Sequence, residues 1–263
     1  MEPNGFNPFF IIKQTDTMFK ETINNYLQTH GYESINLKAV LFDMDGVLFN
    51  SMPNHAESWH KVMKQFGFGL SHEEAYMHEG RTGSGTINII SQRERGCDAT
   101  EEEIQAIYQA KTEEFNKCPK AERMPGALEV LTKIKAEGIV PMVVTGSGQK
   151  SLLERLNRNF PDIFKAELMV TAFDVKYGKP NPEPYLMALK KGGLKPNEAL
   201  VIENAPLGVQ AGVAAGIFTI AVNTGPLNDD ILLNEGANLL FPSMPAFNKS
   251  WETLKQEIEK GRM

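Results

Sequence analysis

Five short apolar runs, separated by stretches of helical periodicity, constrain the fold of this chain more than any other feature of its sequence. Continuous apolar runs of this length are typical of strands that are buried on both faces of a parallel sheet. The runs cover residues 39–42, 140–144, 168–170, 199–202 and 218–222. Because helical stretches alternate with them, for example at 127–136, 184–190 and 207–215, the sequence predicts an α/β fold with a doubly wound, Rossmann-like parallel sheet.

Residues 54–121 break this alternation, because they show helical periodicity throughout and contain no strand-like run. Helices are expected at 55–66, 71–77, 86–93 and 101–117. We interpret this block as a small all-helical cap domain, inserted after the first strand into a core made of 38–53 and 122–263. With hinges near 49–53 and 121–125, such a cap can close over the carboxyl edge of the sheet, where α/β proteins bind ligands.

The two ends of the chain carry no chemistry that we can assign. Residues 1–37 are an extension with one amphipathic helix, whose apolar positions from Phe19 to Leu27 favour packing on the core over binding a partner. Residues 247–260 predict a closing helix. The early apolar run at 9–12 is too short for a membrane span or a secretion signal.

Composition narrows the class of protein further. The 27 Lys and Arg against 33 Asp and Glu give a formal charge of -6, whereas a nucleic-acid or anionic-membrane binder needs a basic face. Cys97 and Cys118 match no metal or redox spacing and read as reduced thiols. We therefore expect a cytoplasmic monomer that acts on a small molecule, with no nucleic-acid or membrane partner.

Polar residues suited to phosphate chemistry follow the apolar runs. Asp43 and Asp45 come after the first run, where two carboxylates are costly to bury without a cation; a turn with capping aspartates and a calcium loop are the alternatives. Thr145, Gly146 and Ser147 follow the second run, and their hydroxyls and N–H groups can hold a phosphate oxygen or simply form a turn.

Two further groups follow the later runs. Lys179 lies in a loop held by two prolines, and taken alone it reads as a surface lysine. Glu203 and Asn204 offer the hard oxygen ligands that Mg²⁺ prefers, or else a capping pair. A doubly wound fold brings all these strand ends together. The four groups of residues therefore indicate a functional site in combination, although none of them does so alone.

The order DMDGVL, VVTGS, YGKPNPEPY and VIENAPLGVQAG resembles the four motifs of the haloacid dehalogenase (HAD) superfamily. The helical insert resembles the cap of its β-phosphoglucomutase-like branch, and the resemblance covers about 38–225. It implies that Asp43 is a nucleophile that forms an aspartyl-phosphate and that Asp45 is the general acid and base. It also implies that Thr145 and nearby N–H groups hold the phosphoryl group, with Ser147 supporting the loop, and that Lys179 offsets negative charge.

The same resemblance implies a Mg²⁺ site. Its ligands would be Asp43, the backbone carbonyl of Asp45 and Asn204, with Glu203 in contact with the ion or just behind it. The family usually has a second Asp where this chain has Asn204, so the site loses one negative charge. Our hypothesis is that cap closure delivers Glu79 to the metal or its waters; the alternative is an exposed Glu in a cap turn.

The remaining cap residues bear on the substrate. Arg81 is the best cap candidate for a substrate phosphate, because its fork of donors matches phosphate oxygens. His55 resembles a mutase residue that orients the acid and base on closure, although a helix-surface histidine is nearly as good a reading; Lys111 is a further candidate for the cleft.

Three functions fit these residues. A Mg²⁺-dependent phosphohydrolase of a small substrate, a sugar phosphate or inorganic pyrophosphate, is favoured, because Glu79 disfavours a second phosphate in the cap. The alternative is a β-phosphoglucomutase that interconverts β-glucose 1-phosphate and glucose 6-phosphate, which His55 favours. A non-catalytic regulator is the weakest, since Asp43, Asp45 and Lys179 are all present.

Overall fold

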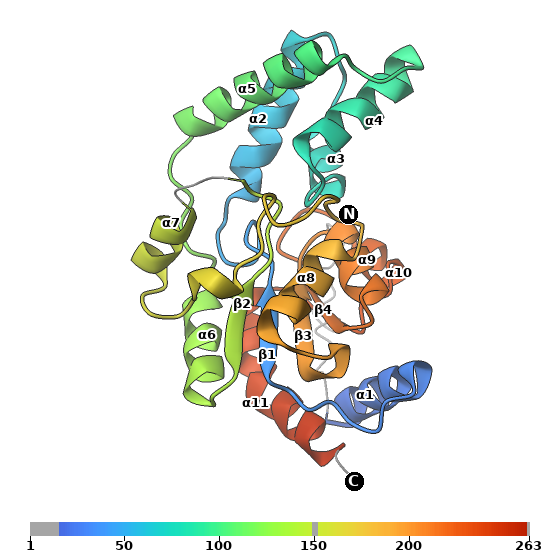
Figure 1. Ribbon diagram of the computed structural model, residues 1–263, viewed down its shortest axis with the longest axis vertical. Helices are drawn as coiled ribbons and strands as arrows, with labels where there is room; N and C mark the ends of the chain where they lie inside the picture. Colours follow the sequence, from blue (N-terminus) through green and yellow to red (C-terminus); the bar gives the residue numbers. More distant parts are fainter. Residues whose placement is uncertain (1–15, 149–151, 262–263) are drawn as a thin grey trace, which may run out of the picture.

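The computed structural model describes residues 16–148 and 152–261 (Figure 1). Within them, parallel strands form one five-stranded sheet in the order β2-β1-β3-β4-β5. The strands are β1 Ala39–Phe42, β2 Val140–Val143, β3 Ala199–Glu203, β4 Phe218–Val222 and β5 Leu239–Phe241. The predicted doubly wound α/β fold is therefore confirmed. The apolar run at 9–12 lies outside the described residues.

One strand prediction is wrong. The run at 168–170 begins inside a short 3₁₀ helix, Ala166–Leu168, and only Val170 pairs with the sheet, in a single bridge to Val144. The chain then turns away, because the Asp174 carboxylate accepts hydrogen bonds from both the N–H and the hydroxyl of Thr171. The fifth strand is instead β5, three residues that carry too short a signal to be recognised in the sequence.

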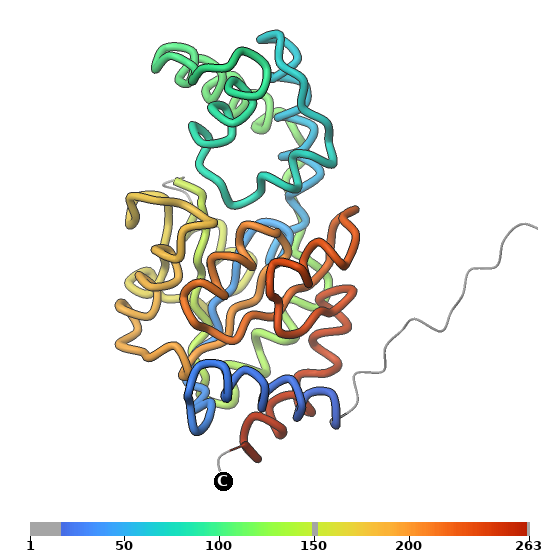
Figure 2. The backbone as a smooth tube through the Cα atoms, turned by 90° about the vertical axis from the view of Figure 1, so that its right-hand side faces the viewer, coloured from blue at the N-terminus to red at the C-terminus, as the bar shows by residue number. Residues whose placement is uncertain are grey.

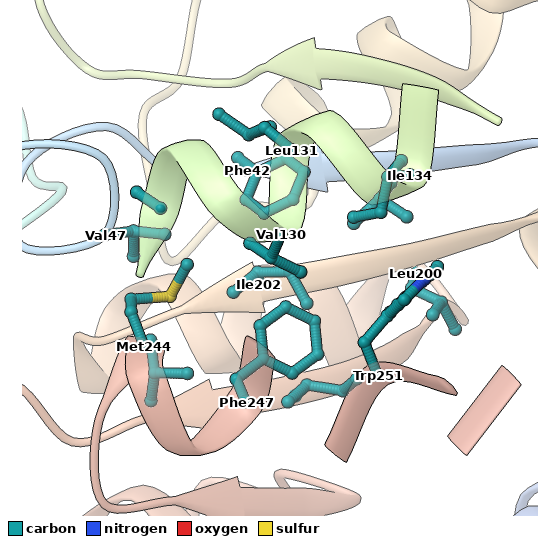
Figure 3. Packing of buried hydrophobic residues seen from close by; sticks show 14 of the residues in the cluster. Phe42, Val47, Val130, Leu131, Ile134, Leu200, Ile202, Met244, Phe247 and Trp251 are labelled. Atoms are coloured by element: carbon teal, nitrogen blue, oxygen red, sulfur yellow. The ribbon is translucent and has the colours of Figure 1, made fainter. Parts of the chain in front are cut away.

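Helices cover both faces of the sheet. Val40 and Phe42 of β1 point into the face packed by α6, α7 and α11, whereas Ala39 and Leu41 point into the face packed by α8 and α9. Figure 3 shows the first of these clusters, where Phe42 and Ile202 pack near α6 and α11. The bounds are α6 Ala127–Ala136, α7 Leu152–Asn159, α8 Glu183–Gly192, α9 Pro206–Ala214, α10 Asp229–Asn234, α11 Met244–Lys260 and a short 3₁₀ turn at Pro196–Glu198.

The N-terminal helix α1 (Asp16–His30) packs against α11 at the end of the core farthest from the helical insert (Figures 1 and 2). Its buried face runs from Phe19 to Leu27, and the Tyr26 hydroxyl donates to the carbonyl of Gly216. The expected amphipathic packing helix is therefore present. No helix among the described residues combines the length and apolar character that a membrane span requires.

Helices α2 to α5 form a separate lobe above the carboxyl edge of the sheet (Figure 2). We call this lobe the cap; its helices are α2 Met52–Gln65, α3 His72–Met77, α4 Gly83–Arg95 and α5 Glu101–Lys117. They enclose their own apolar cluster, which includes Met63, Ile90 and Ile107. The two linker segments that join the cap to the core run side by side, and the N–H of Asn50 donates to the carbonyl of Glu122 at 3.0 Å.

Candidate active site

Parallel strand ends gather the predicted core residues at one edge of the sheet. Asp43 follows β1, and its N–H still donates to the carbonyl of Ile202 on β3 at 3.0 Å. Thr145 lies just beyond β2, while Glu203 is the last residue of β3. All three side chains are buried, so the charges of the Asp43 and Glu203 carboxylates must be compensated within the protein.

Lys179 supplies that compensation. Its Nζ lies 2.5 Å from Asp43 Oδ1, 2.5 Å from Glu203 Oε1 and 3.1 Å from the carbonyl oxygen of Val144. Burial alone would disfavour the ammonium ion, but the two carboxylates outweigh it and raise the pKa of Lys179 above its ordinary value. The lysine is therefore a fixed, buried cation and not the surface residue that its motif alone suggested.

The pKa of Asp43 is raised to about 8, chiefly because its carboxyl is buried. Lys179 lowers this pKa in part, whereas the neighbouring carboxylates of Glu203 and Asp45 raise it. One lysine thus does not neutralise all the acidic groups around Asp43. Negative charge left uncompensated in a buried site favours the binding of a cation.

Glu203 lies behind this pair. Its Oε1 also accepts from the Tyr185 hydroxyl at 2.7 Å, and its Oε2 accepts from the N–H of Asn204 at 3.0 Å. An ideal Cβ at Gly208 would lie only 1.9 Å from Glu203 Oε1, so a glycine in α9 makes room for this carboxylate. The family resemblance places Glu203 either in contact with a metal ion or just behind it. Because both of its carboxylate oxygens accept hydrogen bonds, Glu203 fits the position just behind the ion.

Asp45 is held by residues from the start of the cap. Its Oδ1 accepts from Ser51 Oγ at 2.5 Å and lies 3.5 Å from His55 Nε2. Burial would raise the pKa of Asp45, but these two partners outweigh it and hold the pKa below its usual range. His55 in turn lies 2.8 Å, through Nδ1, from Nζ of the buried Lys111.

This arrangement fixes the state of His55. Burial, followed by the charge of Lys111, lowers the pKa of the imidazole, which favours its neutral form. A neutral ring that accepts from Lys111 at Nδ1 carries its proton on Nε2, which points that N–H at Asp45. Lys111 and His55 therefore form a row of polar contacts that leads to Asp45. The alternative that His55 is only a histidine on a helix surface is wrong.

Thr145, Gly146 and Ser147 form the loop expected to hold phosphate. The N–H of Ser147 donates to Thr145 Oγ1 at 3.1 Å, which fixes the hydroxyl. Thr145 and Gly146 line a small cavity of about 70 Å³ together with Lys179 and the cap residue Gly80. The core loop and the cap thus enclose one space beside Lys179, which pairs with the candidate nucleophile Asp43.

Glu79 reaches into the core from the cap. Its Oε2 accepts a hydrogen bond from Asn204 Nδ2 at 2.9 Å. An ideal Cβ at Gly46, where φ is +84°, would lie 2.0 Å from the same Nδ2, so this glycine leaves the space that the Asn204 amide occupies. Burial and then the charges of Asp43 and Glu203 raise the pKa of Glu79 well above its ordinary value. The alternative of an exposed glutamate in a cap turn is wrong.

Two oxygens of this pair have no partner. Oδ1 of Asn204 and Oε1 of Glu79 are both shielded from solvent and accept no hydrogen bond. Together with the Asp43 carboxylate they offer hard oxygen ligands in an acidic site, so the residues fit Mg²⁺. No cluster of three or more His, Cys, Asp or Glu with metal-site geometry occurs among the described residues, and a set completed by amide and carbonyl oxygens needs none.

Arg81 faces a different space. It lines an open pocket of about 450 Å³ with Lys176, Tyr177 and Asn181, and its Nε is buried without a partner. In the part of the chain that the structure describes, no carboxylate oxygen lies within 4 Å of the Arg81 guanidinium. The sequence pointed to Arg81 but missed Lys176, which lies in a loop of ordinary polar composition.

At the carboxyl edge of a doubly wound sheet, this site combines two aspartates, a buried lysine and oxygen groups that fit a metal ion. Together these features define an enzyme of phosphoryl transfer. The haloacid dehalogenase-like hydrolase family model matches residues 40–222. The chain therefore belongs to the haloacid dehalogenase-like hydrolases, as the motif order indicated, and it is a phosphatase or a phosphomutase.

Named relatives extend this assignment. The chain is 31% identical to hexitol phosphatase A of Escherichia coli over 79% of its length and 95% of that protein. It is 31% identical to a phosphorylated carbohydrates phosphatase of Thermotoga maritima, over 83% and 100%. A solved structure described as "Putative beta-phosphoglucomutase from Bacteroides vulgatus" is 84% identical, with a TM-score of 0.91, and covers 93% of this chain and 100% of that one.

Proposed function

We propose that this protein is a Mg²⁺-dependent phosphohydrolase that acts on a phosphorylated carbohydrate or polyol through an aspartyl-phosphate on Asp43. The observation that carries the proposal is the convergence of Asp43, Lys179 and Asp45, the last oriented by Ser51 and His55. A carboxylate nucleophile is suited to the reaction, because water can later cleave the acyl phosphate that it forms.

In the first step an Asp43 oxygen attacks phosphorus, and the bond from phosphorus to the leaving oxygen breaks. Asp45 donates a proton to that oxygen, so a neutral alcohol leaves. Asp45 holds this proton once substrate is bound, because the added negative charge of the phosphate raises the pKa of a neighbouring carboxyl. We assign the transfer to Oδ2, since Ser51 and His55 both contact Oδ1.

In the second step Asp45 accepts a proton from water, and the water oxygen attacks phosphorus. The bond from phosphorus to Asp43 breaks, which releases inorganic phosphate and restores the carboxylate. Thr145 and the adjoining N–H groups hold the phosphoryl oxygens, while Lys179 offsets the charge that Asp43 and the phosphoryl group share. Positioning and charge neutralisation supply most of the catalysis in such transfers.

Asp43, the carbonyl of Asp45, Asn204 and Glu79 would hold Mg²⁺, with Glu203 behind them. The unpartnered Oδ1 of Asn204 and Oε1 of Glu79 support this assignment. When bound, the ion supplies positive charge beside the transferring phosphoryl group.

The substrate class follows from the cap and from the named relatives. Both phosphatases reported above act, by name, on phosphorylated carbohydrates or hexitols. The pocket that Arg81 and Lys176 line adds two cations, neither of which forms an ion pair within 4 Å in the described chain. These cations suit a substrate with an anionic or hydroxyl-rich distal end. Pyrophosphate, which the acidic cap first suggested, is not the substrate for which either of these two relatives is named, and it serves as a comparison substrate.

A mutase is the second candidate. The row of polar contacts from Lys111 through His55 to Asp45 can hold the acid and base ready for a hydroxyl of a bound sugar, and the 84% identical structure carries a mutase description. Glu79 beside Asn204 opposes it, because a carboxylate in the closed site repels the second phosphate of a sugar bisphosphate.

Phosphate release with Mg²⁺ from a hexitol phosphate, β-glucose 1-phosphate and pyrophosphate tests the proposal. We expect turnover of the hexitol or sugar phosphate by the wild type, its loss in Asp43→Asn, and unchanged turnover in Asp98→Asn on the cap surface. Slow release together with glucose 6-phosphate formation in the presence of a bisphosphate primer would identify a mutase. Turnover of pyrophosphate alone would overturn the assigned substrate class.

A further inference from the structure

One short segment of the cap, residues 76–82, packs directly against loops of the core, and we call it the cap turn. It contacts three glycines of the core: Gly146, Gly178 and Gly225. Each glycine belongs to a different loop at the carboxyl edge of the sheet, and none has a positive φ. The backbone conformation therefore does not require glycine at these three positions. Glycine instead leaves the space that the cap turn occupies.

The closest of these contacts is between Gly225 and Tyr76. A Cβ built on Gly225 would lie 2.9 Å from Cδ1 and 3.0 Å from Cε1 of the Tyr76 ring. Carbon atoms that touch without strain lie 3.5 to 4.0 Å apart, so the ring rests directly on the glycine backbone. Tyr76 lies near the end of α3, and its flat, rigid ring packs on the backbone of Gly225.

The other two contacts complete a three-point support. A Cβ on Gly178 would lie 3.0 Å from the Thr82 methyl carbon, and one on Gly146 would lie 3.3 Å from the carbonyl oxygen of Gly80. The cap turn is therefore in close contact with three separate loops of the core.

The Gly225 loop is tied to the candidate metal site. The hydroxyl of Thr224 donates to the carbonyl of Gly46 at 2.7 Å. Gly46 is the same glycine that leaves room for the Asn204 amide. On the cap side, the N–H of Glu79 donates to the carbonyl of Tyr76 at 3.3 Å, so the ring and the carboxylate belong to one turn. A shift of Tyr76 on Gly225 therefore moves Glu79 relative to Asn204.

We propose that Tyr76 and Gly225 form a positioning pair that sets Glu79 against Asn204 and so completes the magnesium site when the cap closes. Neither residue touches the reacting atoms; they act through Glu79. This inference rests on the metal role that we proposed for Glu79, and its test must separate the two.

The test is the dissociation constant for Mg²⁺, measured by titration calorimetry on the full chain. In Gly225→Ala a methyl group enters the space of the Tyr76 ring, so we expect the closed position to be disfavoured and the constant to rise about tenfold. Gly261→Ala is the matched control, because its nearest neighbour would lie 3.6 Å away and it ends α11. Thermal unfolding of each variant confirms that it is folded.

Two backgrounds make the mechanism specific. In Tyr76→Ala the added methyl has room, and in Glu79→Gln the pair has nothing to position, so Gly225→Ala should change the Mg²⁺ constant in neither. An unchanged constant in Gly225→Ala alone, or an equal tenfold rise in both backgrounds, would overturn the inference. A wild type that binds no Mg²⁺ would overturn the metal role of Glu79 itself, and the inference with it.

Discussion

Asn204 and Glu79 are 125 residues apart in the sequence, yet the Asn204 amide donates to the Glu79 carboxylate at 2.9 Å. The contact joins core to cap at the point where the family usually has an aspartate in place of Asn204. A neutral amide alone leaves the site one charge short. In the metal role that we propose for Glu79, its carboxylate supplies that charge only while the cap is closed, so we expect closure and cation binding to favour each other.

The first prediction concerns Glu79→Gln. The variant keeps the size of the side chain but removes a charge that Asp43 and Glu203 repel, so we expect higher thermal stability without Mg²⁺. Its affinity for Mg²⁺ should fall by about 10- to 100-fold, so added Mg²⁺ should stabilise the variant less than the wild type. Thermal unfolding with and without Mg²⁺ measures both effects.

The exposed Glu73→Gln on α3 is the control for this experiment, and it should behave as the wild type does. Equal stabilisation of Glu79→Gln and wild type by Mg²⁺ would contradict a metal role for Glu79.

The fold could be predicted from the sequence where burial leaves a continuous apolar run. The strands at 39–42 and 199–202 are buried on both faces and were recognised, and the helix at 101–117 lies where its periodicity placed it. The prediction failed at 168–170, because the Asp174 turn ends the pairing after one bridge. Tertiary contacts decide such short segments.

The site could be predicted as far as the motifs reach. Ser51 and Tyr185 were missed, because one stands at a helix N-terminus and the other in a helix with a buried apolar face, both ordinary positions. Ser51 makes no side-chain cap bond and turns instead to Asp45, whereas Tyr185 turns to the buried Glu203. Only the folded arrangement reveals the carboxylates that attract these hydroxyls.

The second prediction concerns His55→Ala. Loss of the imidazole removes the Nε2–H that faces Asp45 and leaves Lys111 without its partner. We expect kcat to fall about 100-fold, at the lower end of what acid–base catalysis contributes, with KM little changed. Steady-state phosphate release measures both constants. His72→Ala, on the cap surface beside Glu57, is the control, and a similar loss in both variants would speak against orientation of Asp45.

The third prediction concerns Lys179→Met. The change leaves the carboxylates of Asp43 and Glu203 buried without their common cation, which costs about 3–5 kcal/mol of unfolding free energy. Phosphate release should be lost as well. Urea unfolding at neutral pH measures the first effect. Lys191→Met breaks the partly exposed pair with Asp174 and should cost about 1 kcal/mol or less; equal losses would contradict the role of Lys179.

The fourth prediction concerns the pH dependence of stability. Burial lowers the pKa of Lys111 to about 8 from an ordinary value of 10.5. Between these values the unfolded chain binds the proton more tightly than the native protein does. Stability from this group therefore increases as the pH rises from about 8 to 10.5, and it is lowest below pH 8, where the buried amine must carry its charge.

Lys111→Met removes this dependence while keeping the length of the side chain. The two pKa values differ by about 2.5, which corresponds to about 3 kcal/mol of unfolding free energy. The unfolding free energy of the variant minus that of the wild type should therefore be larger at pH 7 than at pH 9.5. Urea unfolding of both proteins at both pH values measures this difference. Lys117→Met, at the exposed end of α5, should show no such difference. Other amines and tyrosines titrate equally in both proteins, so they cancel in the difference between the two unfolding free energies. If that difference does not change with pH, burial does not lower the pKa of Lys111 and the prediction is wrong.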